Sequence, residues 1–224
     1  MHLIATDSGY LDRPVALSRL ILAPGERVEI LIDFTAGANC SLVSDNISNT
    51  AMGGRSNGQF VVLLFAINTT LPARIDGLSE NLDGVLPDLD AAGASVRRFS
   101  LDMSMGMGMM MTRSNRQFSI NNAAFDETAL NFNVAHNSLE RWVVQGDLMM
   151  HPFHIHGVRF QVLSENGQQP RSENRGWKDT VLVNGQVELA VRFEKSASGS
   201  TPFMYHCHIL EHEDGGMMGQ FSVS

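Results

Sequence analysis

Histidines gather in two short windows of this sequence, and their spacing is typical of metal binding. The chain holds eight His, and six of them fall within residues 151–156 and 206–212. Neutral imidazole is the commonest metal ligand in proteins and suits copper, zinc, iron and nickel alike. Because residues two apart share one face of a β-strand, His154 and His156 can converge on one metal centre. His151 lies three residues before His154, across a proline, and is expected to face a different centre.

The second window adds a thiol and a thioether to the imidazoles. His206 and His208 share one strand face, so Cys207 between them points to the other. His212 follows Cys207 by five residues, and Met217 follows His212 by another five. Two imidazoles, a thiolate and a weak axial methionine form the ligand set of blue copper, and the second imidazole would come from the first window. One strand would then contribute to two metal centres through adjacent residues.

Two other interpretations of these windows are weaker. Zinc favours closed tetrahedral sets of Cys and His without a thioether, so Met217 and the division of ligands between two strand faces favour copper. Cys40 and Cys207 are the only cysteines and could form one disulfide, but a metal thiolate explains Cys207 better. Ordinary core histidines do not account for six His with Cys and Met at these spacings.

The rest of the chain must supply strands that position these ligands. Short runs rich in β-branched and aromatic residues are bounded by turn residues and predict strands at 2–7, 27–34, 60–67, 141–147, 158–164, 179–184, 188–194, 204–210 and 219–224. Asn166-Gly167 and Asn184-Gly185 predict hairpin turns. Many short strands without a long amphipathic helix predict an all-β fold of β-sandwiches.

The strand pattern is interrupted once and divides the chain in two. Residues 69–95 are rich in Leu, Asp, Gly and Pro and predict a connector with short helical turns. Residues 96–224 contain enough strands for a complete sandwich, whereas residues 1–68 predict only the latter part of one. An incomplete sandwich leaves sheet edges and apolar residues uncovered, so we expect self-association.

Composition excludes several classes of partner. The net charge is −8 and no basic patch is present, so a nucleic-acid partner is not expected. No apolar run approaches the ~20 residues of a membrane-spanning helix, and no membrane partner is expected. Residues 1–11 lack the basic and apolar order of a signal peptide. We therefore expect either a cytosolic protein or a chain that begins after its export signal.

The two histidine windows also carry a family resemblance. HPFHIHG at 151–157 and HCHILEHEDGGMMG at 206–219 resemble the multicopper oxidase family, above all the bacterial CueO-type cuprous oxidases of copper resistance. HLIATDSGYL, LAPGERVEILIDF and GWKDTV extend the resemblance over nearly the whole chain. It implies Greek-key, cupredoxin-like sandwiches, namely the end of a middle domain followed by a complete third domain. It also implies a periplasmic oxidoreductase that oxidises Cu(I) or phenolic reductants and reduces O2 to water in copper homeostasis.

The same resemblance implies copper as the cofactor and gives each ligand a role. The type 1 blue copper would be held by His151, Cys207, His212 and axial Met217. A type 2 copper would bind His154, and the type 3 pair would bind His156, His206 and His208. Glu213 would supply protons during oxygen reduction, as a nearby carboxyl group can. The family takes four more cluster histidines from two His-x-His motifs that are absent here, so the isolated chain is expected to be inactive or weakly active.

Methionines form a third chemical feature. Residues 103–111 contain six of the 13 Met of the chain. Soft thioethers select Cu(I), which favours copper handling over a flexible, gap-filling apolar loop. The resemblance implies a Cu(I) substrate site built from Asp147, Met149 and Met103. A further Asp of that site has no counterpart, because Gly108 stands about where it should.

Two other functions remain open from the sequence. The chain could be a copper-binding electron-transfer or Cu(I)-buffering module without turnover. It could also be a structural relative that has kept the fold and lost the metal, although the intact set of His, Cys and Met disfavours this.

Overall fold

Almost all the regular secondary structure of the described residues is β-strand. The computed structural model describes residues 1–45, 59–72, 75, 77–103, 118–146 and 149–224. Within these ranges the only α-helix, α1 (Leu210–Asp214), has five residues. Among the described residues, no helix has the length and apolar character needed to cross a bilayer. The predicted all-β class is confirmed.

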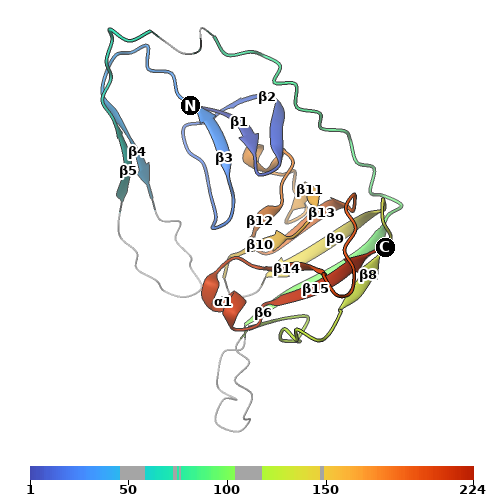
Figure 1. Cartoon of the computed structure of the whole chain (residues 1–224). Coiled ribbons are helices and arrows are strands. Elements are labelled where there is room, and N and C mark those ends of the chain that lie inside the picture. Colours follow the sequence, from blue (N-terminus) through green and yellow to red (C-terminus); the bar gives the residue numbers. More distant parts are fainter. Residues whose placement is uncertain (46–58, 73–74, 76, 104–117, 147–148) are drawn as a thin grey trace.

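Two five-stranded sheets form a sandwich in the second half of the chain (Figure 1). One sheet has the order β12 (Thr180–Val183), β10 (His151–Ile155), β14 (Phe203–Cys207), β15 (Met218–Val223) and β8 (Phe132–Val134). The other has the order β11 (Arg159–Glu165), β13 (Gln186–Arg192), β9 (Leu139–Gly146), β6 (Ser95–Met103) and β7 (Phe118–Ile120). Neighbours in space are mostly distant in sequence, as in a Greek key.

Buried aromatic rings from both sheets fill the sandwich. Phe99 of β6 lies 4.6 Å from the Trp142 ring of β9 and 5.0 Å from the Tyr205 ring of β14, measured between centroids. Phe153 and Phe221 are fully buried in the same cluster. Aromatic side chains of this size dominate core energetics, so this cluster holds the two sheets at a fixed separation.

Pairing within the first sheet brings the two histidine windows together. β10 and β14 are antiparallel, with Phe153 opposite Cys207 and His154 opposite His206. Because successive side chains alternate between the faces of a sheet, this register directs Cys207 into the sandwich and His206 to the other side.

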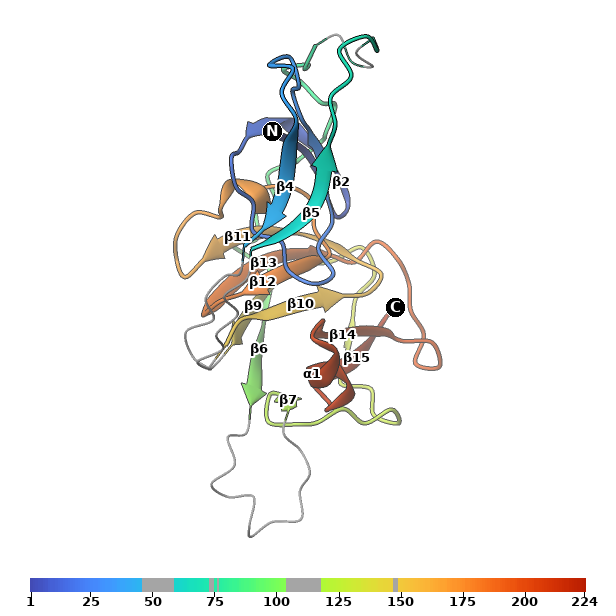
Figure 2. The same ribbon diagram turned by 90° about the vertical axis from the view of Figure 1, so that its left-hand side faces the viewer.

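The first part of the chain adds two smaller sheets. β2 (Gly9–Ala16), β1 (His2–Thr6) and β3 (Val28–Leu31) pair in that order and lie on the β11 and β12 side of the sandwich (Figure 1, Figure 2). β4 (Cys40–Ser44) and β5 (Phe60–Phe65) form a separate hairpin, set apart from the sandwich in Figure 1. Residues 60–64 of β5 are 50–74% exposed although all five are large and apolar. Self-association through such a surface stays a prediction.

Three local expectations are wrong. Asn184-Gly185 joins β12 and β13, which belong to different sheets, so it makes a crossover and not a hairpin. The described residues of 69–94 form no helix, and only single hydrogen-bonded turns close there, from Leu71 N–H to the Asn68 carbonyl and from Ala94 N–H to the Ala91 carbonyl. The strand expected at 204–210 ends at Cys207, because the chain turns there into α1.

One predicted turn agrees with the structure, whereas some strands were not predicted at all. Asn166-Gly167 is a tight turn, with Glu165 and Gln168 exchanging backbone hydrogen bonds and positive φ angles of 51° and 73° at the turn residues. The sequence patterns missed the strands β2, β4, β6, β7 and β8, and β2 includes Pro14. β2 is an edge strand, where a proline is tolerated.

A buried lysine joins the first sheet to the sandwich. Lys178 is 2% exposed, and its Nζ lies 3.4 Å from Asp7 and 3.2 Å from Glu26, both from the first part of the chain. Burial raises the pKa of Glu26, against the opposing effect of the Lys178 charge. Thr6 strengthens the junction by donating its hydroxyl to the Trp177 carbonyl at 2.7 Å.

Removing this lysine is expected to loosen the junction. Lys178→Met should lower the free energy of unfolding by about 3–5 kcal/mol, because it leaves the buried Glu26 carboxyl group without its cation and removes one of the two cations beside Asp7. Lys195→Met removes the other lysine, which is exposed, and should change stability by less than ~0.5 kcal/mol. Urea denaturation of both variants at neutral pH checks the comparison, and equal losses would show that the buried cluster is not stabilising.

Candidate metal centres

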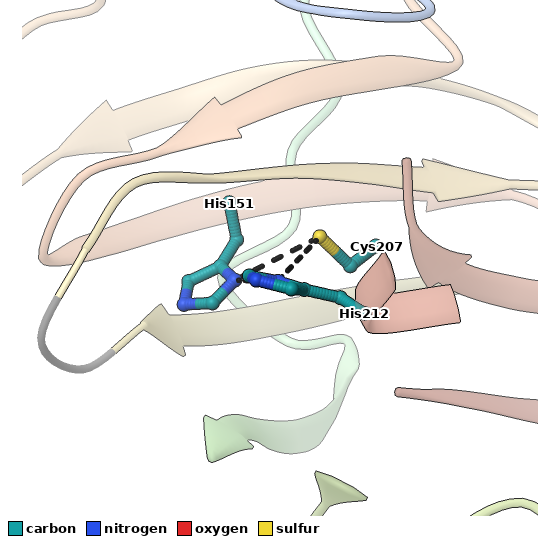
Figure 3. Close-up of side chains that lie close together, drawn as sticks. All are labelled: His151, Cys207 and His212. Atoms are coloured by element: carbon teal, nitrogen blue, oxygen red, sulfur yellow. Dashed lines mark hydrogen bonds between the residues drawn. The ribbon is translucent and has the colours of Figure 1, made fainter. Parts of the chain in front are cut away.

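Three buried side chains converge at one end of the sandwich. His151 begins β10, Cys207 ends β14 and His212 lies on α1. Cys207 Sγ is 3.7 Å from His151 Nδ1 and 3.5 Å from His212 Nδ1, and the two nitrogens are 3.2 Å apart (Figure 3). The structure thus brings together residues separated by up to 61 positions in sequence.

The spacing of these donors fits a bound transition metal. A tetrahedral ion with bonds of about 2.0–2.1 Å to nitrogen and about 2.3 Å to sulfur separates its donors by roughly 3.3–3.6 Å. The three observed separations of 3.2–3.7 Å bracket that range. Two imidazoles and a thiolate are also the donors that suit copper.

Two further residues enclose this first donor set. Met217 is fully buried, its N–H donates to the His212 carbonyl at 2.8 Å, and its carbonyl accepts from Cys207 N–H at 3.1 Å. Phe118 of β7 stacks on the His212 imidazole, with centroids 4.3 Å apart and planes inclined by 24°. No sequence pattern pointed to Phe118, since a lone aromatic residue in a short strand is usually part of the core.

Burial keeps Cys207 and His212 of the first set uncharged. It raises the pKa of Cys207 to about 12. Burial, with the neighbouring His151, lowers the pKa of His212 to about 4. At neutral pH the thiol therefore keeps its proton, and this imidazole is neutral, with one N–H and one free lone pair. A metal ion binding here displaces the thiol proton and meets an imidazole that is already deprotonated.

A second donor set lies on the other side of the same strands. Ligand atoms of His154, His156 and His206 lie within 4.8 Å of one another. His156 Nε2 is 3.1 Å from His206 Nε2, and the His208 ring lies 5.4 Å from the His206 ring between centroids. Four imidazoles from the two windows therefore gather at one place.

Hydrogen bonds determine which nitrogen of two of these rings can bind a metal. His154 Nδ1 lies 2.9 Å from the Asp179 carbonyl, and His206 Nδ1 lies 3.0 Å from the Cys207 carbonyl. A carbonyl only accepts, so Nδ1 donates and Nε2 keeps its lone pair for a metal. Burial, followed by the neighbouring imidazoles, lowers the pKa of His156 to about 4, which keeps that ring neutral as well.

The two donor sets are directly connected through the chain. Cys207 belongs to the first set, and its neighbours His206 and His208 belong to the second. β14 ends at Cys207, yet His208 keeps its place because its N–H donates to the Pro152 carbonyl at 2.7 Å. Cys207 and its two neighbours therefore serve different donor sets, as strand alternation predicts, although only part of the window is strand.

The remaining predicted site residues surround these sets. Glu213 Oε2 lies 3.3 Å from His206 Nδ1. Met149 is half-buried and packs against the sandwich core, and Met103 is buried at the end of β6. Asp147 and the Met-rich residues 104–111 lie outside the described residues.

Sequence reasoning missed several residues that contact the second set. Thr180 Oγ1 lies 2.9 Å from His154 Nδ1. Gly25, with φ of +85°, packs so closely on His208 that an added Cβ would lie 2.4 Å from the ring. Asp7 and Arg27 contact the same region. LAPGER and GWKDTV contain three of these residues, but neither segment has a spacing that predicts contact with a metal ligand.

Comparison with known proteins gives the family of this chain. The family model for multicopper oxidases matches residues 99–224. The cell division protein FtsP of Escherichia coli is 35% identical over 233 residues, covering 100% of this chain and 46% of that protein. FtsP of Salmonella typhimurium is 36% identical over 230 residues with the same coverage. The chain therefore spans about half the length of the curated relatives it matches.

Solved structures of multicopper oxidases also resemble this chain. A laccase-like multicopper oxidase, CueO from Ochrobactrum sp., superposes with a TM-score of 0.86 and is 35% identical, covering 100% of this chain and 50% of that one. A multicopper oxidase from Campylobacter jejuni, described as a metallo-oxidase, gives 0.80 at 28% identity, covering 99% of this chain and 48% of its own. These likenesses confirm the cupredoxin-like sandwich, and with the family match they show that this chain belongs to the multicopper oxidase family.

Proposed function

We propose that this chain is the blue-copper part of an oxidase that oxidises Cu(I) or phenolic reductants and reduces O2 to water. His151, Cys207, His212 and Met217 would hold the type 1 copper. Copper bound at the two donor sets supplies the one-electron redox chemistry. As part of the same proposal, the enzyme works in copper homeostasis in the periplasm.

The observation that carries the proposal is the position of Cys207 between two members of the second set. Its thiol meets His151 and His212, while the adjacent residues place their imidazoles beside His154. The backbone on either side of Cys207 thus joins a donor set for one redox metal covalently to a donor set for further metal ions. A simple copper store has no need of this arrangement.

The second set would supply part of the ligands of a copper cluster, so a partner would have to supply the others. His154 would hold type 2 copper, and His156, His206 and His208 would hold the type 3 pair. A cavity of about 650 Å³ borders His154 and His156 and leaves room for further imidazoles. The proposed partner is the remaining half of the oxidase, whether on this polypeptide or another.

Glu213 is the proposed proton donor for oxygen reduction. Its carboxylate lies beside His206 and is 29% exposed on its side chain, so it contacts both the second donor set and solvent. A carboxyl group in that position can take a proton from water and release it near the cluster.

A second function is favoured by the names of the relatives. Curated proteins 33–36% identical to this chain are named cell division protein FtsP. A member of the family could therefore act in division, or hold copper for electron transfer or Cu(I) buffering, without turnover. Copper content and oxygen uptake distinguish these alternatives.

The purified chain is expected to bind copper at the first set and show the intense visible absorption of a copper thiolate, with no catalytic oxygen uptake. Copper analysis, spectroscopy and an oxygen electrode measure the three quantities, and Cys207→Ser should abolish the absorption. Adding the missing half should raise the copper count and start oxygen uptake. A chain that binds no copper would favour the division role, and copper without uptake after complementation would favour the storage role.

Met217→Leu is expected to keep the absorption and raise the reduction potential of the first site. A weak axial thioether stabilises the oxidised ion, and leucine cannot do so. A redox titration of the copper-loaded chain measures the shift. Met204→Leu, on β14, is the matched control and should leave the potential unchanged; equal potentials in all three proteins would remove Met217 from the ligand set.

The double variant Asp147→Ala/Met149→Leu is expected to lower Cu(I) turnover in the complete enzyme by roughly tenfold, the effect of one ligand contact worth ~1.4 kcal/mol. Steady-state oxygen uptake with Cu(I) measures it. Turnover of a phenolic reductant and the visible absorption should stay the same, because neither needs a Cu(I) site. Unchanged Cu(I) kinetics would exclude these two residues from the substrate site.

A further inference from the structure

A paired arginine and aspartate connect the first part of the chain to the second donor set. Arg27 donates from Nη1 and Nη2 to the two carboxylate oxygens of Asp179, each at 2.6 Å. Two parallel bonds of this kind constrain direction as well as distance. Thr180 donates its hydroxyl to the same carboxylate at 2.9 Å.

Hydrogen bonds to Asp7 and Gly25 hold the guanidinium group in place. It donates to the Asp7 carbonyl and to the Gly25 carbonyl, each at 2.9 Å. The Arg27 N–H donates to Asp7 Oδ1 at 2.7 Å, while Asp7 Oδ2 accepts from the Asp179 and Thr180 N–H groups at 3.3 Å. The first part of the chain therefore forms hydrogen bonds with the Asp179 side chain and with the backbone N–H groups of residues 179–180.

Asp179 and Thr180 are also the residues that orient His154. Its Nδ1–H points to the Asp179 carbonyl and to Thr180 Oγ1, both at 2.9 Å, with the Asp179 carboxylate at 3.5 Å. The hydroxyl of Thr180 presents a lone pair to His154 because its own hydrogen goes to Asp179. Rotation of the Asp179 side chain would turn that hydroxyl and weaken the bond to the ring.

We infer that Arg27 is a positioning residue for the second donor set. Acting through Asp179 and Thr180, it holds the proton of His154 on Nδ1 and aims Nε2 at the metal. The first part of the chain is thereby coupled to the geometry of a centre whose proposed ligands in this chain all lie in the sandwich. The inference rests on the proposed function in taking His154 as a copper ligand.

The guanidinium geometry suits this role. Its fork matches both oxygens of one carboxylate, whereas an ammonium group acts as a single point of charge. The Arg27 side chain is 52% exposed, so replacing it opens no cavity in the core. Arg13 offers a matched control, because its ion pair with neighbouring Asp12 is exposed and far from His154 in sequence.

The first measurement uses the metal-free chain with 15N-labelled histidine. NMR gives the tautomer of His154 and the exchange rate of its Nδ1–H, and the signal is assigned by its loss in His154→Gln. We expect the exchange to accelerate about tenfold or more in Arg27→Gln and less in Arg27→Lys, with no change in Arg13→Gln. Exchange rates and tautomer unchanged in Arg27→Gln would overturn the inference.

The second measurement uses zinc(II) as a probe, added after the first donor set has been loaded with copper. Zinc affinity should fall roughly 10–100-fold in Arg27→Gln, as is typical when an outer partner of a ligand is lost. The copper thiolate absorption should be unchanged, which shows that the variant is folded. An unchanged zinc affinity in Arg27→Gln would overturn the inference. Failure of zinc to bind the unaltered chain would instead count against the proposed function, and the proton-exchange measurement would then decide the role of Arg27.

Discussion

The antiparallel pairing of β10 with β14 is the constraint on which the rest of the structure depends. It places Phe153 opposite Cys207 and His154 opposite His206. A shift by one residue would move every side chain of one strand to the opposite face and separate the donors of both sets. The aromatic core around Phe153 and Tyr205 makes such a shift costly, since these rings are packed between two sheets. Packing of apolar residues thus determines where the polar donors meet.

That same packing controls the charge of the donors. Several imidazolium groups buried together would repel one another, and a buried thiolate would need hydration. Burial instead keeps the Cys207 thiol protonated and the His156 and His212 rings neutral near pH 7. The donors therefore accept a cation without first breaking ion pairs among themselves. The proton that leaves Cys207 on metal binding is the remaining cost.

The first part of the chain does more than cover one end of the sandwich. Lys178 is bound there by Asp7 and Glu26, and Arg27 reaches Asp179 beside His154. Gly25 lets the backbone approach His208 more closely than any side chain would permit. Residues with no ligand role of their own therefore restrict how two candidate ligands can lie. The two small sheets of this segment therefore contribute to the geometry of the site.

The sequence by itself determined the donor types, the division of neighbouring residues between two strand faces, and the all-β class. These depend on local spacing, because the period of a strand acts over two or three residues. Only the tertiary structure decided that Phe118 covers His212 and that Arg27 reaches Asp179. Asn184-Gly185 shows the same limit, since a turn motif does not say which sheet the next strand joins. Contacts across 50–150 residues depend on how sheets pack, and no local pattern records that choice.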